Sequence, residues 1–177
     1  LDCLDFLKAC SDGRDVALGN QVLVIGGGNA AVDTARSALR KSRAKVTILY
    51  RRSFEEMPAD KEEINEALRE GVRIEFLTAP KKMLVSGGKV KGLECLKTEL
   101  READHSGRKR PVPVEGSEFV IEAEAIISAV GQEPDYSPVT SGLASGNKAL
   151  AVDRETLQAN AEGVFAAGDF VNGAGTV

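Results

Sequence analysis

Three small residues between Gln21 and Arg52 have the types and the spacing that a dinucleotide-binding turn requires. Gly26, Gly28 and Ala31 fit the pattern G-x-G-x-x-A. In such a turn the first glycine allows a sharp bend after a strand, and the second lets a pyrophosphate approach the backbone. The small third residue lets the next helix pack close to the sheet, and the N–H groups at the helix start attract phosphate. The pattern predicts dinucleotide binding, whereas the bare glycines alone would also fit an ordinary tight turn.

The residues at the end of the next predicted strand indicate which dinucleotide binds. A site for NAD usually has an Asp or Glu about twenty residues after the glycines, where it holds the ribose hydroxyls. This sequence has Tyr50, Arg51 and Arg52 there instead. Two guanidinium groups suit a 2′-phosphate, by charge and by bidentate hydrogen bonding. The arginines therefore favour NADP(H), and the alternative is a solvated basic strand end.

A strand, a helix and a second strand surround these residues. Residues 22–25 are an apolar run, typical of a strand that is buried on both faces of a parallel sheet. The periodicity then becomes helical, with Val32 and Ala35 predicted on the buried face and Thr34 predicted off it. A second apolar run at 46–49 completes a strand–helix–strand unit, which is the context that a dinucleotide site needs.

The remaining patterns predict an α/β, Rossmann-like fold with a parallel sheet and an inserted antiparallel β-meander. Asp60 and Glu63 resemble a capping box at the start of a helix that Gly71 ends, and an alternating strand follows. From Lys81 we expect a meander of three strands, which includes a charged loop at 101–110. A buried strand at 125–130 then returns to the parallel sheet.

Composition and charge exclude several other classes of protein. Hydrophobic residues make up 42% and charged residues 28% of the 177-residue chain, which is ordinary soluble globular composition. The net charge of −4 provides no basic field for nucleic acid or an anionic membrane. There is no apolar run of membrane-spanning length and no signal-peptide pattern. We expect a cytoplasmic protein with neither nucleic acid nor membrane as a partner.

The cysteines give no sign of a redox or metal centre. Cys3, Cys10 and Cys95 form no C-x-x-C pair, and their odd, sparse number indicates structural thiols in a reducing compartment. No ligand spacing matches a metal site, and His105 is predicted in a solvated loop. We therefore predict no metal ligands.

Four segments give the sequence a resemblance to a known family. They read VLVIGGGNAAVDTAR at 22–36, VTILYRRSFEEMPA at 46–59, AIISAVGQEPD at 125–135 and ETLQANAEGVFAAGDFVNG at 155–173. With them the sequence resembles the pyridine-nucleotide-dependent flavoprotein oxidoreductases, most closely the small (beta) subunit of NADPH-dependent glutamate synthase and its relatives. The resemblance implies an NADPH domain nested inside an FAD domain.

The resemblance also implies an organisation of the chain and roles for its residues. A lead-in helix and linker (1–19) would precede an NAD(P)-binding domain (20–134) and a returning partial segment of the FAD-binding domain (135–177). The NADPH pyrophosphate and ribose would contact Gly26, Gly28, Asn29, Ala30 and Ala31. Arg51 and Arg52 would bind the 2′-phosphate, and the nicotinamide end would lie beside Ala129, Val130 and Gly131. Gly168 and Asp169 look like the second FAD motif, whose Asp typically holds the ribityl–phosphate portion of the flavin.

The resemblance implies a function in which hydride passes from NADPH to FAD, so no acid–base catalytic residue is needed. The family's first FAD fingerprint is absent from this sequence, as are the cysteines that bind iron–sulfur clusters in many relatives. We expect NADP(H) to bind this chain, FAD to bind the full-length protein, and a large subunit or iron–sulfur protein to be the partner. The isolated chain is expected to be inactive. A non-catalytic nucleotide-binding or interaction module, and an NADH-preferring relative with another electron acceptor, are the alternatives.

Overall fold

The computed structural model describes residues 1–103, 107–131, 145–146 and 149–172. The chain divides into two compact units, Leu1–Val130 and Gly131–Val177. The domain boundary expected after residue 134 remains a prediction. The predicted loop position of His105 lies outside the described residues.

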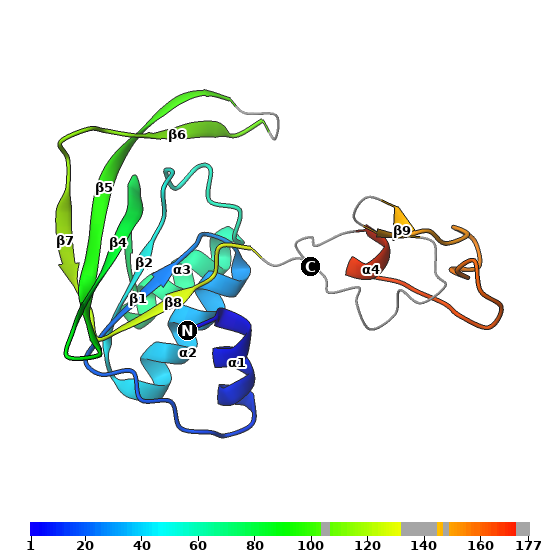
Figure 1. Cartoon of the computed structure of the whole chain (residues 1–177), viewed down its shortest axis with the longest axis horizontal. Coiled ribbons are helices and arrows are strands. Elements are labelled where there is room, and N and C mark those ends of the chain that lie inside the picture. Colours follow the sequence, from blue (N-terminus) through cyan, green and yellow to red (C-terminus); the bar gives the residue numbers. More distant parts are fainter. Residues whose placement is uncertain (104–106, 132–144, 147–148, 173–177) are drawn as a thin grey trace. The chain divides into compact units, whose positions relative to one another are not determined.

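A four-stranded parallel sheet forms the centre of the first unit (Figure 1). Its strands are β1 (Gln21–Ile25), β2 (Lys45–Leu49), β3 (Arg73–Glu75) and β8 (Ala125–Ser128), in the order β3-β2-β1-β8. Val24 of β1 pairs with Ile48 of β2 on one side and with Ile127 of β8 on the other, and all three are fully buried. This arrangement confirms the predicted parallel sheet, because a strand buried on both faces must be apolar throughout.

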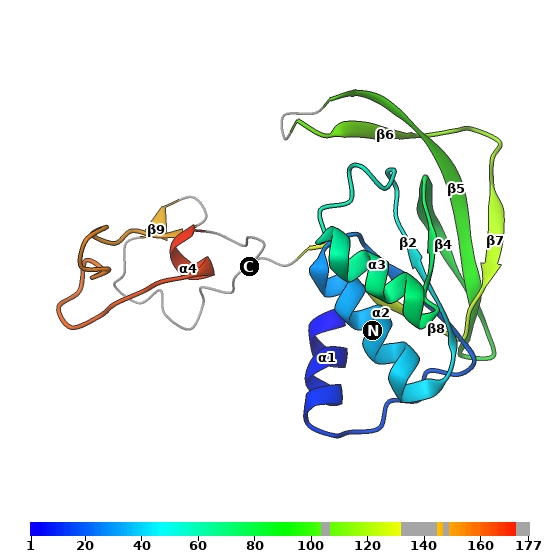
Figure 2. The ribbon, with the colours of Figure 1, turned by 180° about the vertical axis from the view of Figure 1, so that it is seen from behind.

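Three helices cover one face of this sheet (Figure 2). They are α1 (Cys3–Ser11), α2 (Asn29–Ser42) and α3 (Lys61–Glu70). Val32 and Ala35 of α2 are buried as predicted, but the prediction for Thr34 is wrong, since it is fully buried. The reason is that α2 packs against α1 and α3 as well as against the sheet, which widens its buried arc.

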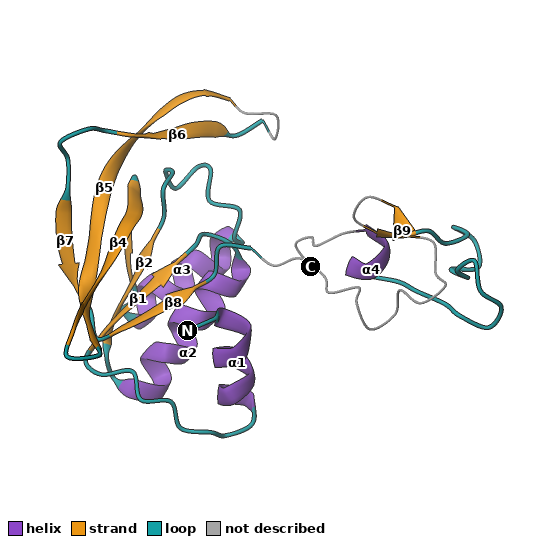
Figure 3. Cartoon of the chain, viewed as in Figure 1, coloured by secondary structure: helices purple, strands orange, loops and turns teal. Residues whose placement is uncertain are grey.

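An antiparallel sheet accompanies the parallel one (Figure 3). It consists of β4 (Thr78–Ser86), β5 (Lys89–Ala103), β6 (Lys109–Pro113) and β7 (Phe119–Glu122), and β5 pairs with each of the other three. The predicted charged loop at 101–110 is wrong, since β5 continues to Ala103 and β6 begins at Lys109. A hairpin needs no apolar residues where neither face is buried, and Pro111 is tolerated because β6 pairs with β5 alone among the described strands.

A second apolar cluster joins the two sheets. Leu23 of β1 and Leu49 of β2 pack with Leu93 and Cys95 of β5 and with Ala123. Burial raises the pKa of the Cys95 thiol to about 11, so the thiol stays protonated and serves as packing, as predicted. The first unit therefore has three layers: helices, parallel sheet and antiparallel sheet.

The second unit has little regular structure in its described residues. It contains β9 (Ser145–Gly146), β10 (Ala149–Leu150) and the short helix α4 (Asp169–Asn172). Among the residues described there, Leu150 is the one buried hydrophobic side chain, and Phe165 is 63% exposed. No helix in the described parts of either unit has the length and apolar character of a membrane span.

A candidate dinucleotide-binding site

The carboxyl ends of β1, β2 and β8 lie side by side, and predicted NADPH-binding residues follow each of them. The glycine turn follows β1, the two arginines follow β2, and Ala129 and Val130 follow β8. Two hydrogen bonds join these ends: Gly26 N–H donates to Leu49 O (3.1 Å), and Ala129 N–H donates to Ile25 O (2.8 Å). Ligands of open α/β sheets bind at such an edge, so the topology places these residues where a nucleotide is expected.

Gly26 is required by the backbone itself. Its φ of 150° lies in the region that favours glycine. A Cβ at this position would lie 2.3 Å from the carbonyl oxygen of Ala129, which is closer than atoms can approach. Gly26 therefore permits the bend that brings β1 and β8 together, in agreement with the role expected for the first glycine of the motif.

Gly28 is different, because nothing in the described chain demands a glycine there. Its φ is −88°, which any residue adopts, and a Cβ would meet no atom within 4 Å. The space beside Gly28 is open. This is the geometry expected where a ligand, and not the protein, approaches the backbone.

The helix α2, whose N-cap residue is Gly28, also lacks the side-chain cap that α1 and α3 have. Asp2 caps α1 by accepting from Leu4 N–H (2.8 Å), and Asp60 caps α3 by accepting from Glu62 N–H (2.7 Å). In contrast, Gly28 supplies no side-chain cap to α2, and the first turn of α2 contains no acidic residue. Within the described chain the N–H groups of Asn29 and Ala30 donate to no acceptor. These free N–H groups and the open space beside Gly28 fit a pyrophosphate.

The loop after β2 clamps the glycine turn in place. Gly27 packs against the ring of Tyr50, so closely that a Cβ on Gly27 would lie 2.4 Å from two ring atoms. The Tyr50 hydroxyl donates to Glu56 O (2.6 Å), and Ala59 N–H donates to Gly27 O (3.1 Å). The sequence patterns assign no role to Gly27, and they include Tyr50 only as part of the strand end before the two arginines. The available signal was a third glycine in the turn and an aromatic residue at the end of a buried strand.

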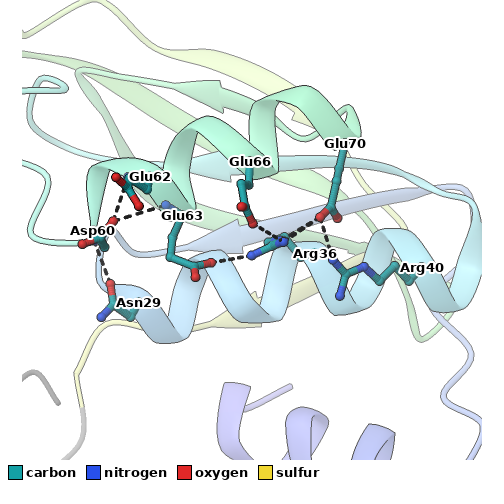
Figure 4. A network of polar contacts seen from close by, with 8 residues as sticks. All are labelled: Asn29, Arg36, Arg40, Asp60, Glu62, Glu63, Glu66 and Glu70. Carbon is teal, nitrogen blue, oxygen red and sulfur yellow. Dashed lines mark hydrogen bonds and ion pairs between the residues drawn. The ribbon is translucent and has the colours of Figure 1, made fainter.

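Ion pairs and hydrogen bonds fasten α2 to α3 (Figure 4). Arg36 of α2 pairs with Glu63, with Glu66 (2.8 Å) and with Glu70 (2.7 Å), all on α3. At the other end of the interface, Asp60 N–H donates to the Asn29 side-chain oxygen (2.9 Å). The start of α2 is thereby held in register with the start of α3.

These pairs also shift the pKa values of their members. The hydrogen bond to Glu70 raises the pKa of Arg36, and the hydrogen bond from Arg36 lowers the pKa of Glu70 below its usual value. Asp60 caps α3 as predicted, but the predicted capping box is only half formed. The carboxylate of Glu63 bonds to Arg36, and the Asp60 N–H that a capping box would pair with Glu63 donates to Asn29 instead.

The two arginines after β2 have different surroundings. Arg51 is exposed, and no described residue forms a side-chain hydrogen bond or ion pair with it, while its carbonyl accepts from Thr98 Oγ1 (2.7 Å). Arg52 is 5% exposed, and its Nε donates to the carbonyl oxygen of Lys109 on β6 (2.8 Å). Both arginines line an open groove of about 1020 Å³. The groove is completed by residues of the β5–β6 hairpin: Arg101, Glu102, Ala103, Arg110, Pro111 and Val112.

The remaining predicted residues are exposed or lie in the second unit. Val130 is 71% exposed at the end of β8, and Gly131, which follows it, has a φ of 116°. Gly168 (φ 65°) and Asp169 are exposed at the start of α4. Among the described residues no group of three His, Cys, Asp or Glu side chains could hold a metal ion.

The chain is similar to two curated proteins over most of its own length. It is 48% identical over 141 residues to the NADPH-Fe(3+) oxidoreductase subunit beta of Geobacter sulfurreducens, covering 79% of this chain and 21% of that protein. It is 37% identical over 177 residues to the glutamate synthase [NADPH] small chain of Azospirillum brasilense, covering 98% of this chain and 36% of that protein. The chain thus spans only about a fifth to a third of the length of these relatives.

The fold is also that of a solved structure. Mycobacterium tuberculosis FprA, determined in complex with NADPH, matches 99% of this chain with 54% of its own, at a TM-score of 0.72 and 18% identity. At this identity the likeness shows the fold alone. The family model described as pyridine nucleotide-disulphide oxidoreductase matches residues 2–177, which is almost the whole chain. The chain therefore belongs to the pyridine nucleotide-disulphide oxidoreductase family.

Proposed function

We propose that the chain is the NADPH-binding part of a flavoprotein oxidoreductase. One observation carries this proposal: α2 is uncapped, and its N-terminus opens onto free space beside Gly28. A helix start with unsatisfied N–H groups carries a partial positive charge, which a pyrophosphate neutralises. The similarity to two NADPH-named oxidoreductases supports the same conclusion.

Each residue of the site has a distinct task in this proposal. The N–H groups at the start of α2 bind the pyrophosphate, with Asn29 and Ala30 beside it. Gly26 shapes the turn, and the buried Ala31 lets α2 pack close to the sheet. Arg51 is free to bind the 2′-phosphate, and Arg52 supports it by holding the turn after β2 against β6. Ala129, Val130 and Gly131 would flank the nicotinamide end. Bound NADPH supplies a hydride that a flavin accepts, so this chain needs to bind and orient and not to transfer protons.

The proposal extends to FAD and to a partner protein. Gly168 and Asp169 would contribute to an FAD site in the full-length protein. The relatives are named as a beta subunit and a small chain, so we expect a larger or iron–sulfur partner subunit that takes the electrons. Three free cysteines, none in a disulfide, agree with a cytoplasmic location.

Titration of NADPH into the unmodified chain and into Gly28→Val tests the proposal. Because the branched side chain would occupy the space beside the N–H groups, we expect affinity to fall by about tenfold or more, the equivalent of one charge-assisted hydrogen bond. The affinity of Gly28→Ala for NADPH should lie between that of the unmodified chain and that of Gly28→Val. The midpoint of thermal unfolding should change little in Gly28→Ala, since a Cβ there meets no atom within 4 Å. Normal NADPH binding by Gly28→Val would show that the phosphates lie elsewhere.

A further inference from the structure

The β5–β6 hairpin is attached directly to the turn that carries Arg51. The hydrogen bond from Arg52 Nε to Lys109 O joins this turn to β6, and the bond from Thr98 Oγ1 to Arg51 O joins it to β5. In both views of the chain the hairpin reaches beyond the end of β2 (Figures 1 and 2). The hairpin is therefore held in a fixed place beside the proposed 2′-phosphate site.

Among the described residues, Arg110 of the hairpin has no hydrogen-bond or ion-pair partner for its side chain, whereas the neighbouring Arg101 has one. Arg101 of β5 and Arg110 of β6 are opposite each other in the strand register. Arg101 donates from Nε (3.0 Å) and Nη2 (2.6 Å) to Glu99. In the part of the chain that the structure describes, no hydrogen bond or ion pair involves the Arg110 guanidinium. Arg110 is also exposed, so its cation is available to a ligand.

Arg110 and Arg51 are both placed next to the same hydrogen bond. Arg51 precedes Arg52, and Arg110 follows Lys109, whose carbonyl accepts from Arg52. Both unpartnered arginines line the one groove. Arg52 and Arg101 add further positive charge there, and Glu102 is the one carboxylate among the lining residues that the structure describes. Like charges that line one groove repel one another unless an anion binds between them, so the groove suits a highly charged anion such as a phosphate monoester.

The groove also offers apolar surface beside these charges. Ala103, Pro111 and Val112 belong to the hairpin and line it. Apolar side chains next to a cationic cluster suit a flat heteroaromatic ring that carries a phosphate nearby. The adenosine 2′-phosphate end of NADPH has this combination of ring and charge.

We propose that Arg110 is a second ligand of the 2′-phosphate, so that two separate parts of the fold determine the preference for NADPH. Arg51 approaches from the end of the parallel sheet and Arg110 from the inserted hairpin. This inference rests on the proposed function, because it requires that the nucleotide binds at the glycine turn. It adds a specificity residue that the glycine motif and the strand end do not predict.

The test compares Arg110→Gln with Arg73→Gln, a matched change at an exposed arginine at the start of β3 that does not line the groove. Each variant is titrated with NADPH, NADH and adenosine 2′,5′-bisphosphate. We expect Arg110→Gln to lower the affinity for NADPH and for the bisphosphate by about tenfold, as for loss of one charge-assisted hydrogen bond. Its affinity for NADH should change less than about twofold. Arg73→Gln should change all three affinities less than about twofold, because Arg73 does not line the groove and solvent screens its charge from the ligand. Arg110→Lys, which keeps the charge, should retain most of the preference.

Two further variants separate the possible failures. If Arg51→Gln lowers the NADPH preference and Arg110→Gln does not, the inference is overturned and the proposed function stands. Equal losses for NADPH and NADH in Arg110→Gln would also overturn it, since they would indicate a structural effect. If the unmodified chain binds neither nucleotide, or Gly28→Val binds both normally, the proposed function fails as well. In the double variant Arg51→Gln with Arg110→Gln, a combined loss that differs from the product of the single losses would support a shared phosphate.

Discussion

Three consecutive glycines follow β1, and each has a different neighbour that explains it. Gly26 faces the backbone of Ala129, Gly27 faces the ring of Tyr50, and Gly28 faces open space. The first and third could be predicted from their spacing, because the G-x-G-x-x-A pattern is a local property of the sequence. Gly27 could not, because its constraint comes from Tyr50, which reaches it only through the pairing of β1 with β2.

Alanine substitutions should distinguish the second and third glycines. Gly27→Ala forces a methyl group into the Tyr50 ring, which its hydrogen bond to Glu56 O keeps from moving freely. We expect a loss of about 1–3 kcal/mol in the free energy of unfolding, as for overpacking of a buried site. Gly28→Ala is the control and should leave stability nearly unchanged. Urea unfolding of both variants measures the difference, and equal effects would contradict the packing described for Gly27.

At the scale of helices and strands, the sequence predicted the elements whose pattern is local. The buried run in β1, the helical spacing in α2 and the Asp60 cap of α3 each depend on residues that are close together in the sequence. The patterns do not predict the hairpin strand β6, because four of its five residues are charged or proline and none is buried. Its register depends on β5, so short-range periodicity gives no sign of it.

The contact between α2 and α3 leads to a prediction about thermal stability. Arg36 bonds three glutamates of α3, whereas Arg40 bonds only Glu70 among the described residues and its side chain is 62% exposed. Arg36→Met should therefore lower the midpoint of thermal unfolding at pH 7 more than Arg40→Met does. Circular dichroism melts of both variants beside the unmodified chain make the comparison.

The same contact should weaken in acid. The hydrogen bond from Arg36 lowers the pKa of Glu70 from its ordinary value of 4.5. A lowered pKa in the folded state means that stability is present above about pH 4.5 and is lost as the pH falls further through the folded-state pKa. The stability difference between the unmodified chain and Arg36→Met should therefore shrink below about pH 4.5. A difference that stayed constant down to about pH 3 would show that lost packing, and not charge, causes the effect.

At the scale of the whole molecule, four separate segments carried the family resemblance, and three of them meet at the ends of β1, β2 and β8. The groove that Arg51 and Arg110 line could not be predicted, because these residues are far apart in the sequence. The hydrogen bond from Arg52 to the Lys109 carbonyl brings their segments together. The fourth segment lies in the second unit, where the described residues contain a single buried hydrophobic side chain. The roles of Gly168 and Asp169 in FAD binding stay a prediction for this reason.

The most direct test of the central claim is calorimetric titration of the purified chain with NADPH and, separately, with NADH. If α2 binds the pyrophosphate and the groove beside Arg51 binds the 2′-phosphate, both nucleotides should bind at one site per chain. NADPH should bind about 10- to 100-fold more tightly, because charge-assisted hydrogen bonds to a phosphate contribute about 1.5–3 kcal/mol. The preference should decrease as salt concentration rises, since the groove is open to solvent. Equal affinities for the two nucleotides, or binding of neither, would contradict the account.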